Sequence, residues 1–353
     1  MPTLARFDWQ VFPVAEFSAH AAAWRALNAR VTDSPALDPD FVAPLLDQFA
    51  DRHARLCVAG DPGDPVAMTI VTSRRNGVWQ TFQPAQAPIC LWISRTDVPT
   101  AALAGALMRK LSPFALLFGL SQLDPELLPR PPDDKYLRTL DYIQTGRITV
   151  SGNFDDYWAA RGKNLRHNLK RQSNRMVTDG VSGQLEILTE ARDMATALAE
   201  YGRMETAGWK AVGGTAIAAD NAQGRFYRDM LERFAARGAA RVYAYRLAGK
   251  IAAVDLCILQ GDTLIILKTT YDETMSGYSP AMLMRQAAFK DMFADGRVKH
   301  IEFYGKVMDW HTKWTKEIRT LYHLNYYRYG FLARLFGQEQ VPSGAVAVTP
   351  DTT

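Results

Sequence analysis

Four side chains in the second half of the sequence could hold or transfer a proton. His311 follows the last strand that we expect, and its ordinary pKa of about 6.5 suits acid–base chemistry near neutral pH. Asp255 and Lys268 lie inside apolar strands, where an unpaired charge is costly to bury, so each needs a partner or a cleft. Tyr304 ends the strand expected over residues 298–304. These residues are our candidates for catalytic roles, and His311 is the one that we expect to handle the proton.

Three of these candidates also have a purely structural interpretation. His311 could pack between Trp310 and Trp314. Asp255 and Lys268 could pair with each other or lie on a solvated face. The sequence leaves both interpretations open.

A turn before a helix could bind phosphate. The strand expected over residues 262–271 leads through the turn 273–280 into a helix over 281–294. Backbone N–H groups at a helix N-terminus attract anions, and Pro280 fits the first helical turn because its missing N–H costs nothing there. A routine strand-to-helix turn is the alternative. The turn residues that we expect to contact a phosphorylated donor are Ser276, Gly277, Tyr278 and Ser279.

A cluster of cations occupies another expected helix, residues 157–176. No acidic residue lies between Asp156 and Asp179, and we expect Arg166 and Lys170 to contact phosphate. The phosphate could belong to CoA, a sugar nucleotide, a lipid headgroup or RNA, although no Phe, Tyr or Trp is interleaved for stacking on bases. A solvated cationic face is the alternative. The apolar residues that would anchor this helix are Trp158, Leu165, Leu169 and Met176.

The elements that must position these residues follow the same order in both halves of the chain. In the first half we expect helices over residues 14–29 and 38–50, strands over 54–59, 65–73 and 78–82, a helix over 100–110 and a strand over 114–120. In the second half we expect helices over 190–207 and 223–237, strands over 240–247, 250–260 and 262–271, and then the helix and strand already named. This repeat predicts an α/β fold with two copies of one helix-helix-β-β-β-helix-β unit.

Proline-rich segments indicate the domain boundaries. A Pro-rich seam lies at residues 125–134, and the basic helix follows it. We expect an N-terminal domain over residues 1–150, a C-terminal domain over 151–336, and a disordered tail over 337–353 that is rich in Pro, Ser and Thr.

Composition excludes several classes of protein. The 353 residues are 48% hydrophobic and 22% charged, which suits two globular domains, and the net charge of +4 does not by itself indicate nucleic acid. Cys57, Cys90 and Cys257 are odd in number and widely spaced, so we expect neither disulfides nor a metal. No apolar stretch approaches the roughly 20 residues of a membrane-spanning helix. We expect a cytoplasmic protein, with peripheral contact at the inner face of the membrane left open.

Short motifs in the second half add a family resemblance. They are the basic run 163–175, Gly208-Trp209-Lys210, Arg225-Phe226-Tyr227, Ala252-Ala253, Lys268 with Tyr271-Asp272, Tyr278-Ser279-Pro280, Ile301-Glu302-Phe303 and Trp310-His311-Thr312-Lys313-Trp314. With the repeated unit, they resemble the GNAT N-acyltransferase fold, and the tandem arrangement is similar to CelD/BcsL-type and FemAB-like acyltransferases. The resemblance covers about residues 14–328.

The resemblance implies a fold and a donor. It implies two tandem GNAT-like acyl-CoA N-acyltransferase domains with mixed central sheets, and acyl-CoA as the co-substrate. It also implies an acceptor from the cell envelope: a lipid such as a sphingoid base, as in ceramide synthase-like relatives, or a polysaccharide precursor. The sequence departs from the family pattern at Ala281, where glycine is usual after Ser-Pro, and at His311, which takes the position of a lysine.

These observations predict one function and leave two alternatives. The sequence contains no Gly-x-Ser-x-Gly elbow, so direct acyl transfer from acyl-CoA to an amine or hydroxyl is simpler than a serine-linked intermediate. The first alternative is an aminoacyl-tRNA-dependent FemAB-like transferase, in which Arg166, Lys170 and Arg171 would contact tRNA phosphates. The second is a non-catalytic accessory protein of polysaccharide biosynthesis.

Overall fold

The computed structural model describes residues 7–207 and 217–336. The chain divides into two compact units. Unit 1 takes the described residues up to Gln144 and from Thr320 onwards, and unit 2 takes Thr145–Arg319. The tail expected over residues 337–353 and the motif Gly208-Trp209-Lys210 lie outside the described residues.

Unit 1 is built on a mixed sheet in the order β1-β2-β3-β4-β6-β13, with β5 paired to β3. Its strands are β1 (Trp9–Pro13), β2 (Arg55–Asp61), β3 (Asp64–Arg75), β4 (Val78–Thr81), β5 (Trp92–Ser94), β6 (Leu117–Leu123) and the later part of β13 (Glu317–Tyr327). Its α-helices are α1 (Phe17–Val31), α2 (Pro39–Phe49), α3 (Thr100–Leu111) and α10 (Gly330–Phe336).

The strands of unit 2 lie in the order β7-β12-β11-β10-β9-β8, with both parallel and antiparallel pairs. Its strands are the end of β7 (Leu137–Thr149), β8 (Gly183–Leu188), β9 (Ala240–Leu247), β10 (Lys250–Gln260), β11 (Thr263–Tyr271) and β12 (His300–Glu302). Its helices are α4 (Phe154–Ala159), α5 (Lys163–Thr178), α6 (Ala191–Ala207), α7 (Ala222–Ala236), the 3-10 helix η4 (Glu273–Tyr278), α8 (Pro280–Ala294) and α9 (Asp309–Thr312).

The two units repeat one architecture, as the sequence predicted. Two helices, three antiparallel strands, a helix and a returning strand occur in each unit in the same order. In unit 1 the returning strand β6 pairs in parallel with β4, residues 117–119 with 78–80. In unit 2, β12 pairs in parallel with β11 over residues 300–302 and 263–265. Each parallel pairing is three residues long.

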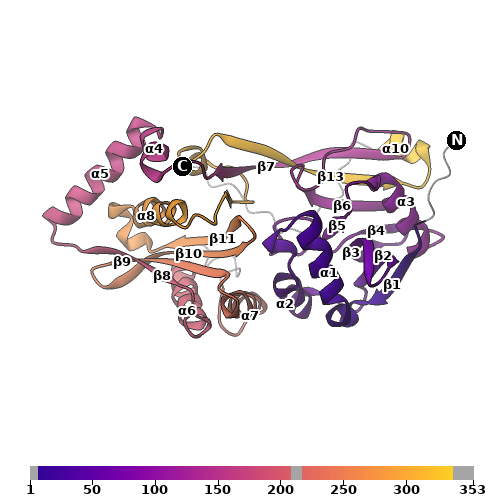
Figure 1. The fold of residues 1–353 in the computed structure, drawn as a ribbon, viewed down its shortest axis with the longest axis horizontal. Coiled ribbons are helices and arrows are strands. Elements are labelled where there is room, and N and C mark those ends of the chain that lie inside the picture. The colour runs from indigo at the N-terminus through magenta and orange to yellow at the C-terminus, as the bar shows by residue number, and fades with distance from the viewer. Residues whose placement is uncertain (1–6, 208–216, 337–353) are drawn as a thin grey trace. The chain divides into compact units, whose positions relative to one another are not determined.

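Each unit contains one strand that follows the elements of the other unit in the sequence. β7 follows the elements of unit 1 in sequence, yet its residues 147–149 pair with β12 of unit 2. β13 follows the elements of unit 2, yet its residues 322–327 pair with β6 of unit 1. The expected boundary after residue 150 followed sequence order. The compact units differ from it because strand pairing determines which sheet a strand completes (Figure 1).

Some expected elements differ in the structure. The basic helix expected over residues 157–176 is two helices, α4 and α5, because the backbone of Gly162 is extended (ψ 139°) and starts α5 anew. The strands β1, β5, β7, β8 and β13 were not predicted from the sequence. The strands β9 and β10 begin and end at the expected residues.

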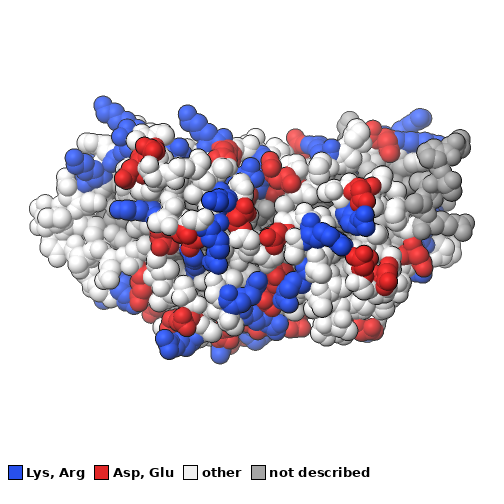
Figure 2. Space-filling model, viewed as in Figure 1, with Lys and Arg blue, Asp and Glu red and all other residues white. Residues whose placement is uncertain are grey.

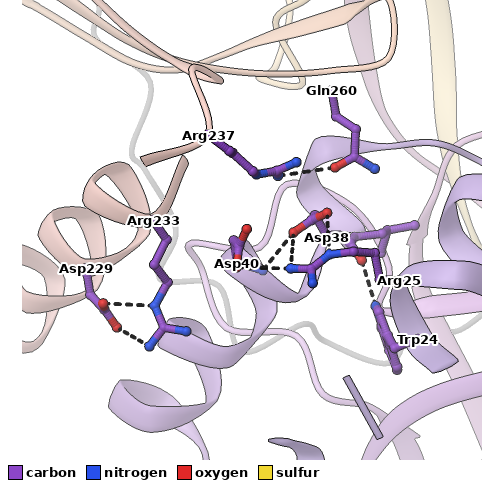
Figure 3. Close-up of polar contacts among 9 residues, drawn as sticks. Trp24, Arg25, Asp38, Asp40, Asp229, Arg233, Arg237 and Gln260 are labelled. Atoms are coloured by element: carbon purple, nitrogen blue, oxygen red, sulfur yellow. Dashed lines mark hydrogen bonds and ion pairs between the residues drawn. The ribbon is translucent and has the colours of Figure 1, made fainter. Parts of the chain in front are cut away.

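Local chemistry explains how the best-predicted elements form. The turn between β9 and β10 places Ala248 and Gly249 at φ values of 47° and 79°, which suits a tight hairpin. In unit 1, the Asp38 side chain caps α2 by accepting from the N–H of Asp40, and Pro39 occupies the first turn. Arg25 of α1 forms ion pairs with Asp38 and Asp40 (Figure 3).

Helices cover both faces of the unit 2 sheet. α8 lies on one face, and α6 and α7 lie on the other (Figure 1). Leu283, Met284 and Phe289 of α8 belong to one buried cluster with Cys257 of β10 and Trp314. α8 is therefore fixed along its length, and so is the position of its N-terminus.

Candidate active site

A cavity of about 520 Å³ lies in unit 2 at the N-terminus of α8. Its walls come from residues 160–172, from Ser279 and Met282 at the start of α8, and from residues 312–316. The basic helix, the expected phosphate turn and the segment after His311 therefore meet around one space.

One face of α5 supplies polar groups to this cavity. Asn164, Asn168 and Gln172 line it, and their four-residue spacing places them on one side of the helix. Leu165 and Leu169 are buried beside them. The carboxamides can donate and accept hydrogen bonds without adding charge. These amides were not predicted from the sequence, although their four-residue spacing is visible in it.

The cations around the cavity differ from those expected. Arg161, Lys313 and Lys316 line it, and no acidic residue does so among the described lining residues. Arg161 donates to the carbonyl oxygens of Tyr157 and Trp314, which holds its guanidinium in place. Arg166 and Lys170 lie on the exposed face of α5 and are not part of the lining. Lysine and arginine side chains stand out over α5 in Figure 2.

The turn before α8 is attached to α5. Arg175 of α5 donates to the carbonyl oxygen of Gly277 (3.2 Å), and the Tyr278 hydroxyl donates to Asp179 (2.8 Å). Ser276 lies within the same 3-10 helix. Of the four turn residues predicted to contact phosphate, only Ser279 lines the cavity among the described residues.

Ser279 has an unusual backbone conformation. Its φ of 53° and ψ of 54° are left-handed, although it is not glycine and it precedes Pro280. Its carbonyl oxygen accepts from the N–H groups of Met282 and Leu283, which starts α8. Strained backbone of this kind often accompanies binding sites. The N-terminus of the 15-residue α8 gives the adjoining cavity a partial positive charge.

Asp255 is fully buried and pairs with Arg285 of α8. Arg285 Nη2 lies 3.2 and 3.3 Å from the two carboxylate oxygens and 3.0 Å from Thr269 Oγ1. The Trp310 ring covers the guanidinium at 4.2 Å. The partner of Asp255 is therefore Arg285. The alternative that Asp255 pairs with Lys268 does not describe the structure.

Lys268 lies on the other face of the sheet from this pair. Its ammonium group is 5.8 Å from the ring of Tyr227 in α7, whereas the neighbouring Thr269 contacts α8. Successive strand residues point to opposite faces, so the sheet separates Lys268 from Asp255. The structure does not bring these two candidates together.

His311 is buried in α9 and is held in one tautomer. Its Nδ1 accepts from the N–H of Met308 (3.0 Å), which leaves the proton on Nε2. The ring stacks on Trp310 and meets Phe303 edge-on. Burial and the nearby Arg285 guanidinium lower the pKa of His311 to about 4. At neutral pH the side chain is an uncharged hydrogen-bond donor.

Tyr304 follows β12 with a left-handed backbone, at a φ of 48°. The guanidinium of Arg319 lies 5.4 Å from its ring, and Arg319 donates to Glu302 (2.8 Å). His311 and Asp255 are linked through Trp310 and Arg285, and Ser279 lies at the cavity. The catalytic roles given to Asp255, Lys268, Tyr304 and His311 stay predictions.

The described residues 7–207 and 217–336 contain no group of three His, Cys, Asp or Glu side chains arranged to hold a metal ion. In the same part of the chain, none of the helices has the length and apolar character needed to cross a membrane.

Comparison with known proteins adds a family model that matches part of the chain and two similar folds. Residues 163–312 match the model of the acetyltransferase (GNAT) domain family. A domain from Agrobacterium fabrum, the C-terminal part of a candidate lysylphosphatidylglycerol synthetase, is similar in structure (TM-score 0.58, 13% identity, 93% of this chain and 98% of that one). A Bacteroides thetaiotaomicron protein of unknown function is also similar (TM-score 0.53, 10% identity, 91% and 100% covered). No curated protein sequence matches the chain.

The matched residues contain the whole cavity lining except residues 160–162 and 313–316. With the repeated units, this match confirms the expected fold class. The chain is an α/β protein of two tandem GNAT-like units with mixed sheets.

Proposed function

We propose that unit 2 transfers an acyl group from acyl-CoA to an amine or hydroxyl of a cell-envelope acceptor. The acceptor would be a lipid, such as a sphingoid base in a ceramide synthase-like reaction, or a polysaccharide precursor. The observation that carries the proposal is the cavity at the N-terminus of α8, which is lined by Arg161, Lys313 and Lys316 and by no acidic residue. We also propose that the chain is related to the CelD/BcsL-type and FemAB-like acyltransferases.

The cavity has the chemistry to hold the phosphates of CoA. Lys313 and Lys316 supply mobile ammonium groups, and Arg161 supplies a fixed guanidinium. The α8 N-terminus adds its partial charge, and the carboxamides of α5 can bind the uncharged amide groups of the pantetheine arm. A volume of about 520 Å³ is large enough for part of such a donor.

The reaction would be a direct displacement. The acceptor nitrogen or oxygen forms a bond to the thioester carbonyl carbon and loses a proton to water, the C–S bond breaks, and the CoA thiolate leaves and is protonated. In the tetrahedral intermediate that forms before the C–S bond breaks, the former carbonyl oxygen carries a negative charge. We assign the stabilising hydrogen bond to Nε2–H of His311, because Nδ1 is engaged by Met308 and the ring is neutral. His311 precedes Thr312 and Lys313, which line the cavity.

Binding of CoA and palmitoyl-CoA by calorimetry tests the donor site. The variant Lys313→Glu/Lys316→Glu should bind CoA at least about tenfold more weakly than the wild type, since two favourable charges become unfavourable. Lys290→Glu is the matched control, because Lys290 is an exposed lysine of α8 outside the cavity. If both variants lose CoA affinity equally, the cavity is not the CoA-binding site.

Turnover tests the assignment of His311. His311→Ala should lower kcat by about 10²-fold or more while leaving the Kd for CoA unchanged, because the hydrogen bond forms only with the negative oxygen. Unchanged kcat in a variant that melts like the wild type would exclude this role.

The alternative of an aminoacyl-tRNA donor has one observation in its favour. Arg166, Lys170 and Arg171 lie on an exposed face of α5, where a nucleic acid could reach them. The name of the similar Agrobacterium protein refers to lysylphosphatidylglycerol, a phospholipid that carries an aminoacyl group. Charged tRNA would then bind with an affinity that falls steeply with salt, and Arg166→Glu/Lys170→Glu would weaken it. No binding of CoA or of tRNA would favour a non-catalytic accessory protein.

A further inference from the structure

Exposed apolar side chains gather in two segments of unit 1. The described residues contain ten large apolar side chains that are strongly exposed, and the four in unit 2 are Val177, Ile187, Tyr271 and Met308. The other six are all in unit 1, and Phe114 (80% exposed), Leu335 (70%) and Phe331 (60%) are the most exposed of them. We call these six the apolar patch: Phe114, Leu116, Tyr329, Phe331, Leu335 and Phe336.

Hydrogen bonds hold the two segments of the apolar patch side by side. The N–H of Arg328 donates to the carbonyl oxygen of Leu116 (2.9 Å), and its guanidinium donates to that of Ala115 (3.1 Å). The Tyr327 hydroxyl donates to the carbonyl oxygen of Phe336 (3.1 Å), which fixes the end of α10. Ala333 is buried on the inner side of this helix, so its outer side carries the apolar groups. The two segments of the apolar patch are therefore held in place by hydrogen bonds.

Cations surround the apolar patch. Arg334 is exposed on α10 among the apolar residues, and Arg109 and Lys110 end α3 just before the Phe114 segment. Lys135 packs against Gly330, at the start of α10. Two acidic residues also lie near these cations: Asp8 is 3.9 Å from Lys110, and the exposed Asp134 adjoins Lys135. Aromatic and aliphatic side chains rimmed by Lys and Arg suit the boundary between the headgroups and acyl chains of an anionic membrane.

We propose that the apolar patch docks unit 1 onto a membrane surface that carries anionic lipids. The aromatic and leucine side chains would enter the headgroup region, and the surrounding cations would lie near lipid phosphates. A soluble partner protein would bury the same apolar area but would not require the rim of cations. The inference does not depend on acyl transfer, although it would bring a lipid acceptor to the same molecule.

Sedimentation of the full chain with lipid vesicles tests the proposal. We expect binding to vesicles of phosphatidylcholine with phosphatidylglycerol, and weaker binding to phosphatidylcholine alone or at high salt. Phe114→Ser/Phe331→Ser/Leu335→Ser should reduce the partition into anionic vesicles at least about tenfold, because three apolar insertions are lost. Val177→Ser/Ile187→Ser removes two exposed apolar side chains of unit 2 and should bind like the wild type.

Further measurements distinguish membrane binding from self-association through the apolar patch. All the substituted side chains are exposed, so the melting temperature should not change, and Arg334→Glu gives a second variant that retains every apolar group. Its affinity for anionic vesicles should fall. Equal binding by the wild type and the triple variant, or no binding by the wild type, would overturn the proposal. So would a dimer in solution that the triple variant abolishes without a change in vesicle binding. Acyl-transfer assays are separate, so either proposal can fail alone.

Discussion

Arg285 of α8 and Asp255 of β10 form a buried ion pair in unit 2, with Arg285 Nη2 at 3.2 and 3.3 Å from the two carboxylate oxygens. Only 2% of Arg285 and none of Asp255 is exposed to solvent. The Nε atom of Arg285 is buried and has no hydrogen-bond partner among the described residues. The pair fixes α8 to the sheet, and its Arg285 guanidinium lies against the ring of Trp310 and helps to lower the pKa of His311.

Removing one partner of this pair should be costly. Arg285→Met leaves a buried carboxylate without its cation, and we expect the free energy of unfolding of unit 2 to fall by about 3–5 kcal/mol. Asp255→Leu/Arg285→Met removes both charges and should recover much of that loss. Urea unfolding of the four proteins in the cycle measures the coupling.

An exposed ion pair of the same unit supplies the control. Arg233 of α7 donates to Asp229 one turn earlier, and both side chains are well exposed (Figure 3). Arg233→Met should therefore cost only about 0.2–1 kcal/mol. A similar cost for Arg233→Met and Arg285→Met would show that burial does not strengthen the Asp255 pair.

Acid should destabilise the protein partly through His311. Its pKa is lowered to about 4 in the folded protein, whereas in the unfolded chain it is about 6.5. Between these values the unfolded chain binds the proton and the folded protein does not, so stability falls as the pH drops from about 6.5 to about 4. His311→Asn should make the melting temperature less dependent on pH over this range.

A buried histidine of unit 1, His323, must be considered in the same measurement. Burial also lowers the pKa of His323 to about 4, and its Nδ1 accepts from the N–H of Gln122. His323→Asn should therefore flatten the remaining pH dependence, and the double variant should show the smallest. An unchanged pH profile in His311→Asn would mean that His311 titrates normally in the folded protein.

The left-handed conformation of Ser279 should cost stability that glycine would recover. Ser279→Gly removes the side-chain clash at a φ of 53° and should be neutral or stabilising by up to about 1 kcal/mol, whereas Ser279→Val should be destabilising. Ala248→Gly, at a φ of 47° in the β9–β10 turn, is the matched control. CoA affinity that falls in Ser279→Gly alone would show that the hydroxyl contacts the donor. Equal affinities would restrict Ser279 to a backbone role.

The exchanged strand β13 should stabilise unit 1 in particular. Leu324 of β13 is fully buried in a cluster with Phe118 of β6 and Leu107 of α3. Leu324→Ala should cost about 2–5 kcal/mol, through lost burial and the cavity left behind. Hydrogen exchange should speed up in peptides over residues 103–123. Equal loss of protection over residues 283–293 of α8 would contradict this assignment.

The sequence by itself determined the repeated order of elements, because that order depends on local patterns. The alternation of apolar residues and the turn at Ala248 and Gly249 gave the ends of β9 and β10 correctly. Proline and its neighbours placed the turn before α8. The cationic character of α5 was also readable, since helical spacing is a property of consecutive residues.

The tertiary structure alone decided which residues meet. Asp255 pairs with Arg285, 30 residues later, and the carboxamides of α5 face Ser279 and Lys313 across the cavity. β7 pairs with β12 of unit 2, and β13 pairs with β6 of unit 1, although each strand follows the elements of the other unit in the sequence. These relationships depend on the pairing of distant strands and on the face that each helix buries. Local propensity does not specify such long-range contacts, because each strand edge and helix face could satisfy its hydrogen bonds and burial with several partners.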